Sequence, residues 1–145
     1  MKKVIIGIVF AAFAVVVFLL LTQSEDDKTF SSPDEVVPTY ETAVNNLTLD
    51  GYSVRTEDTA LDSDIKAKRL YADKGNSFID ICYNLSEDDA KVVFEKYRDK
   101  YENSSFYVLA QNGNYVYCVS DKSTFEICGF AGLANWGYQI IHNGF

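Results

Sequence analysis

The feature that most constrains this chain is an uninterrupted apolar run, Val4–Leu21, which contains no charged residue and no proline. As an α-helix with a rise of about 1.5 Å per residue, this run would be roughly 27 Å long, close to the ~30 Å hydrocarbon core of a bilayer. Lys2 and Lys3 precede the run, and Glu25–Asp27 follow it. By the positive-inside rule, this asymmetry places the N-terminus in the cytoplasm and the rest of the chain outside.

A cleaved signal peptide and a buried core helix are the alternatives to a membrane anchor. The run exceeds the roughly 7–15 apolar residues of a signal peptide, and it ends in Phe18–Leu21 rather than in small residues at a cleavage site. These features favour a single-pass signal anchor in the cell membrane, with Val4–Leu21 in contact with the bilayer. The predicted division is a cytoplasmic stub (1–3), a transmembrane signal anchor (4–22), an acidic tether (23–37) and an extracytoplasmic domain (38–145).

The charge balance excludes nucleic acid as a partner. The chain has 13 Lys and Arg against 21 Asp and Glu, for a net charge of −8, whereas phosphate binding needs clustered cations. A single histidine leaves little material for a metal centre or a catalytic relay. The sequence therefore predicts no cofactor, no metal site and no catalytic residue.

Two helices are expected in the domain. Pro38 suits the first position of a helix that carries apolar residues at helical spacing and stops at Asp50–Gly51. Ser86 is placed to cap a second helix, with Asp89 in the capping-box position and an apolar stripe that ends at Tyr101.

Strands are expected between and after these helices, because short alternating segments are bounded by turn residues. Asn112–Gly113 is a strong signal for a hairpin turn. The predicted strands cover 52–57, 66–72, 77–83, 106–110, 115–119 and 124–129. The prediction is therefore an α+β domain in the order α-β-β-β-α-β-β-β, with two helices grouped on one face of an antiparallel sheet of about six strands.

The three cysteines, Cys82, Cys118 and Cys128, are the first candidates for chemistry. They lie outside the membrane in the predicted topology, where disulfides persist, and three thiols allow three single pairings. Alternatively, they are buried and act as small apolar side chains. No Cys-x-x-Cys motif and no neighbouring cation marks a reactive thiol.

Aromatic residues are the second candidates. If helices cover only one face of the sheet, the other face exposes a set of tyrosines that includes Tyr107, Tyr115 and Tyr117, and such a patch marks a binding surface. If both faces are covered, these residues belong to the core.

These observations favour a membrane-anchored, non-catalytic module that binds a protein or an envelope component. One alternative is a membrane-tethered thiol enzyme that uses one of the cysteines. Another is a sensor or inhibitor module that acts on a neighbouring membrane protein. No sequence motif assigns the chain to a family.

Overall fold

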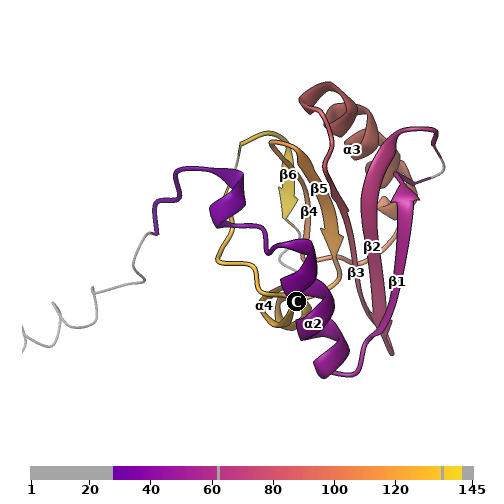
Figure 1. Cartoon of the computed structure of the whole chain (residues 1–145), viewed down its shortest axis with the longest axis vertical. Helices are drawn as coiled ribbons and strands as arrows, with labels where there is room; N and C mark the ends of the chain where they lie inside the picture. Colours follow the sequence, from indigo (N-terminus) through magenta and orange to yellow (C-terminus); the bar gives the residue numbers. More distant parts are fainter. Residues whose placement is uncertain (1–27, 62, 135, 142–145) are drawn as a thin grey trace, which may run out of the picture.

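The computed structural model describes residues 28–141 except 62 and 135, and these residues form one six-stranded sheet with helices on both faces (Figure 1). The strands are β1 (Ser53–Thr59), β2 (Lys66–Lys74), β3 (Ser77–Tyr83), β4 (Val108–Asn112), β5 (Tyr115–Val119) and β6 (Gln139–Ile141). The helices are the 3-10 helix η1 (Pro33–Glu35), α2 (Tyr40–Leu49), α3 (Glu87–Tyr101) and α4 (Lys122–Cys128). The sheet order is β1-β2-β3-β5-β4-β6, with every neighbouring pair antiparallel. The predicted α+β class and antiparallel sheet are confirmed.

Each face of the sheet carries its own core, whereas the sequence predicted helices on one face only. On one face, Tyr117 of β5 packs with Leu47 of α2 and Phe125 of α4. On the other face, Leu109 of β4 packs with Val93 of α3. Because helices cover both sides, β3 and β5 are buried along most of their length, with side chains that alternate between the two cores.

The two predicted helices are confirmed, and their caps explain where they begin. Thr39 precedes α2 and its hydroxyl accepts a hydrogen bond from the backbone N–H of Thr42. Ser86 precedes α3 and accepts a hydrogen bond from the N–H of Asp89 over 3.1 Å. Each cap satisfies a backbone donor that has no partner within the helix.

The strand predicted over 124–129 is wrong, because this segment forms α4. Asp121 caps the helix by accepting a hydrogen bond from the N–H of Thr124 over 2.9 Å. Gly129 ends the helix with φ of +107°, a conformation that favours glycine. A helix brings Phe125 and Cys128 to the same face and into the same core, whereas a strand would separate them onto opposite faces. The sixth strand comes instead from the C-terminal segment, as β6.

Part of the predicted tether belongs to the fold. Val36 and Val37 are 1% and 5% exposed, and the N–H of Ala131 donates to the carbonyl of Val36 over 3.0 Å. The core therefore includes residues before Pro38. The predicted stub and anchor, residues 1–22, lie outside the described residues. Among the residues that the structure describes, no helix has both the length and the apolar character needed to cross a bilayer.

Candidate functional site

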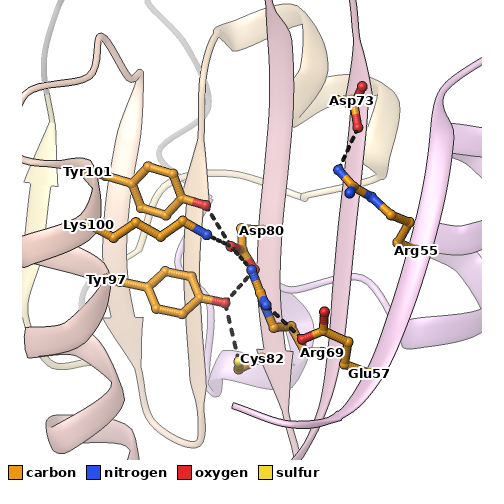
Figure 2. Close-up of polar contacts among 9 residues, drawn as sticks. All are labelled: Arg55, Glu57, Arg69, Asp73, Asp80, Cys82, Tyr97, Lys100 and Tyr101. Atoms are coloured by element: carbon orange, nitrogen blue, oxygen red, sulfur yellow. Dashed lines mark hydrogen bonds and ion pairs between the residues drawn. The ribbon is translucent and has the colours of Figure 1, made fainter. Parts of the chain in front are cut away.

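A buried carboxylate, Asp80 of β3, is the centre of the most polar cluster in the described part of the chain (Figure 2). Asp80 is fully buried on the α3 face of the sheet. Arg69 of the neighbouring strand β2 binds both of its oxygens, from Nε to Oδ1 over 2.8 Å and from Nη2 to Oδ2 over 2.7 Å. Such a bidentate pair is the geometry in which a guanidinium best compensates a carboxylate.

Helix α3 contributes two hydroxyl groups to the same carboxylate. Tyr97 donates to Oδ1 over 2.5 Å, and Tyr101 donates to Oδ2 over 2.6 Å. The two residues are four positions apart, so both rings lie on one side of the helix. Lys100 adds an ion pair, with its Nζ 3.6 Å from Oδ2. Burial and the charge of Asp80 raise the pKa of both tyrosines, so their hydroxyl groups remain donors at neutral pH.

Arg69 joins this buried cluster to the surface. Its Nη1 donates to Glu57 Oε2 over 2.8 Å, and the Glu57 side chain is more than half exposed. Burial alone would lower the pKa of Arg69, but the hydrogen bond and the charge of Asp80 outweigh this effect and raise it. Arg69 and Asp80 therefore satisfy each other's hydrogen bonds, the condition under which buried polar and ionic groups are tolerated.

A pocket of about 400 Å³ opens next to this cluster, on the part of β1 and β2 beside the C-terminal end of α3. We name it the Lys100 pocket. It is lined by Arg55, Glu57, Arg69, Tyr71, Phe78, Lys100 and Tyr101. The lining contains three cations and one acid, in a chain whose acids outnumber its cations by 21 to 13. The lining is therefore richer in cations than the chain as a whole, and each of these cations is ion-paired with Glu57, Asp73 or Asp80.

Two of the three cations present their charged groups to solvent. The guanidinium carbon of Arg55 lies 4.6 Å from the centre of the Tyr71 ring, and Nζ of Lys100 lies 5.0 Å from that of Tyr101. The Arg55 and Lys100 side chains are 66% and 38% exposed. These rings hold the two cations in place by cation–π contact. The arrangement can therefore bind an anionic group between Arg55 and Lys100, with aromatic rings beneath it.

The structure buries all three cysteines and leaves them as free thiols. Cys82 and Cys118 lie on the α3 face, and Cys128 lies in the core on the opposite face. Cys82 Sγ is 3.2 Å from the hydroxyl oxygen of Tyr97. Burial raises the pKa of the Cys82 thiol to about 11, raises that of Cys128 to about 12, and raises that of Cys118 as well. Because a thiolate is the nucleophile, these environments favour packing over reactivity.

The predicted exposed aromatic face is not present. Tyr117 is fully buried, and its hydroxyl accepts a hydrogen bond from Asn112 over 2.7 Å. Tyr107 and Tyr115 are partly buried against the same core, and Tyr115 donates a hydrogen bond to Asp34. The second of the two alternatives therefore holds for these tyrosines, because α2 and α4 cover this face.

Sequence reasoning missed Asp80 and Arg69, although each left a signal. Asp80 interrupts a predicted strand, 77–83, whose other central residues are apolar or aromatic. Because it is two residues from Cys82, its side chain points to the same face of the strand as that of Cys82. A lone charge at a core position requires a partner. The predicted apolar stripe of the second helix includes Tyr97 and ends at Tyr101, which is correct for the rings of both residues but overlooks their hydroxyl groups.

The fold and the pocket together define a small α+β domain with helices on both faces of its sheet and a surface pocket, lined by three cations, beside a buried ion pair. Comparison of the chain with protein-family models, with curated proteins and with solved structures gives no significant match. No group of His, Cys, Asp and Glu suited to a metal ion is found among residues 28–141, with the two gaps noted above.

Proposed function

We propose that this protein is a membrane-anchored binding module whose Lys100 pocket recognises an anionic group on a partner protein or envelope component. The observation that carries the proposal is the pairing of two partly exposed cations, Arg55 and Lys100, across a concave surface. Ion pairs hold both cations in position, because Lys100 lies 3.6 Å from buried Asp80 and Arg55 bonds to Asp73 over 3.1 Å. Preorganised charges of this kind give affinity with little loss of side-chain entropy.

The same geometry supports binding over catalysis at this site. Asp80 accepts hydrogen bonds on both oxygens and has no exposed surface, so it cannot take a proton from a bound molecule. The nearest thiol, Cys82, is buried and has a raised pKa. The membrane anchor in this proposal is supported by the apolar run Val4–Leu21 and its flanking charges.

Site-specific photo-crosslinking in intact cells tests the proposal. A benzophenone amino acid in place of Tyr71 is expected to form a crosslink with the partner, and the same group in place of Leu49, which is 87% exposed on α2, is not. Lys100→Gln and Arg55→Gln are each expected to weaken the Tyr71 crosslink severalfold.

Lys91→Gln provides the matched control, because Lys91 is another half-exposed lysine of α3 and its ion pair is with Asp88, away from the pocket. It is expected to leave the crosslink unchanged. A Tyr71 crosslink that is insensitive to both pocket cations, or that Lys91→Gln weakens equally, would contradict the proposal.

A further inference from the structure

Strand β1 forms a long open edge of the sheet. It pairs with β2 only, and in Figure 1 it is the outermost strand on its side of the molecule. It is seven residues long, and every residue except Val54 is exposed, whereas β6 at the opposite edge has only three residues. A free edge presents unpaired backbone N–H and C=O groups that can bind another strand.

This edge carries three charged side chains, Arg55, Glu57 and Asp58, but lacks other features that usually prevent such pairing. Residues 53–59 include no proline, no glycine and no lysine, and three of them are β-branched. The pairing of β1 with β2 is irregular between Glu57 and Thr59, but β2 supplies the extra residue there, since the partners step from Arg69 to Lys66. The edge strand itself is therefore continuous.

We propose that β1 pairs antiparallel with β1 of a second copy of this chain, about a twofold axis that lies midway between the two copies of Thr56. An axis perpendicular to the sheet keeps the two α3 faces on the same side. Such an axis lies midway between the two facing copies of one β1 residue. The same strand then forms both sides of the interface, as expected of a symmetric dimer, in which each subunit contributes the same surface.

The charges of β1 select this register. With the axis at Thr56, Arg55 lies opposite Glu57 of the partner subunit, and Glu57 lies opposite Arg55 of the partner subunit. Arg55 and Glu57 both face the α3 side, because their partners Tyr71 and Arg69 alternate on that side of β2. Opposite charges directly across a strand pair are stabilising.

The two neighbouring registers are unfavourable for the same reason. An axis at Arg55 places it against the same arginine of the partner subunit, and an axis at Glu57 places two carboxylates against each other. Like charges directly opposite each other destabilise strand pairing. Only the axis at Thr56 gives two attractive pairs, and it also sets the β-branched Thr56 side by side with its counterpart.

The proposed dimer joins the sheets of the two copies into one, with both Lys100 pockets on the same face. It shares Arg55 and Glu57 with the lining of the Lys100 pocket, but it requires no ligand, so its test does not depend on the binding function proposed above. A failure of the dimer test and a failure of the photo-crosslinking test are therefore separate results.

Disulfide trapping of the purified full chain in mild detergent tests the register. Thr56→Cys places the new thiols at the axis, where opposed Cα atoms are about 4.5–5.5 Å apart, within the 4.4–6.8 Å range of disulfides. Thr59→Cys is the matched control, because the two copies of residue 59 would lie about 20 Å apart at ~3.3 Å per residue. The unchanged chain, whose cysteines are buried, gives the background. We expect covalent dimer on a non-reducing gel with Thr56→Cys only.

Charge variants in the Thr56→Cys background test the pairing. Arg55→Glu makes every facing pair acidic and Glu57→Arg makes every facing pair basic, so each variant alone is expected to lose most of the crosslinked dimer. Mixing the two restores opposite charges at both positions, and a crosslinked heterodimer is expected to return. Unfolding of either variant cannot produce this restoration. The proposal is overturned if Thr56→Cys gives no dimer, if Thr59→Cys crosslinks as well, or if mixing restores nothing.

Discussion

At Asp80 a single side chain links the interior of the domain to its candidate site. Its carboxylate is held by Arg69, Tyr97 and Tyr101, and it attracts Lys100 from the rim of the pocket. Replacement of one partner in such a buried cluster leaves the others without compensation, so the cluster is sensitive to every member.

Asp80→Asn is expected to lower the free energy of unfolding by about 3–5 kcal/mol, because the buried guanidinium of Arg69 loses its carboxylate. Urea unfolding followed by circular dichroism measures the change. The matched control is Asp73→Asn, which breaks the exposed pair with Arg55 and is expected to cost less than about 1 kcal/mol. Equal losses in the two variants would show that the Asp80 cluster is not the stabilising feature described here.

The stability of the domain is also expected to fall in alkaline solution. Burial raises the pKa of Cys82 from 9.0 to about 11, so the folded chain holds this proton more tightly than the unfolded chain does. This contribution is complete below about pH 9 and is lost as the pH rises toward about 11. The free energy of unfolding, measured by urea titration at intervals from pH 8 to pH 11, should decline above pH 9. Constant stability over this range would contradict the assignment.

Among the elements, α4 shows most clearly how a cap decides between helix and strand. The segment Thr124–Gly129 has the alternation of a short strand, but Asp121 supplies an N-cap and Gly129 a C-terminal stop. Burial would raise the pKa of Asp121, yet hydrogen bonds from Ser120 and Thr124 outweigh this effect and lower it. The Asp121 carboxylate is therefore ionised at neutral pH. Its negative charge also interacts favourably with the positive N-terminal end of the helix dipole.

Asp121→Ala is expected to reduce the free energy of unfolding by about 0.5–2 kcal/mol, the usual loss for a helix cap. Asp121→Asn keeps the capping oxygen and should retain most of the stability. Thermal unfolding of both variants beside the unchanged chain tests this order. If the asparagine variant is as unstable as the alanine variant, the charge rather than the cap is the stabilising feature.

The sequence predicted local structure better than it predicted contacts between distant segments. α3 and β3 follow from the Ser86 cap and from alternation, because these signals lie within the elements themselves. The partnership of Arg69 with Asp80 depends on the register of β2 against β3, and the covering of the tyrosine face depends on where α4 packs. Neither the ion pair nor the covering of the tyrosines can be predicted from the residues of one short segment. The sequence therefore predicts the strand that carries Tyr117 but does not decide between an exposed face and the core.

At the scale of the whole molecule, the apolar run Val4–Leu21 and its flanking charges predict how the chain is placed in the membrane. With Lys2 and Lys3 inside, the domain should face outward, and protease added to intact cells should digest it or release it. Immunoblotting against the C-terminal domain measures this result, with a known cytoplasmic protein as the protected control and a known outside protein as the digested one. Survival of the domain while the outside protein is digested would show that the orientation is wrong.

The contact between α2 and α4 has a consequence for how the chain is made. Asn46 of α2 donates to the carbonyl of Cys128 over 3.3 Å, and Tyr52 lies 2.8 Å from the Thr124 hydroxyl, so the first helix of the core is sealed by the last. A ribosome releases these partners about 80 residues apart, at a synthesis rate of roughly 5–20 residues per second. During that interval α2 is already available to cover its part of this face, whereas β4, β5 and α4 are still being made. The core on this face is therefore complete only after α4 has emerged, even though α2 is made first.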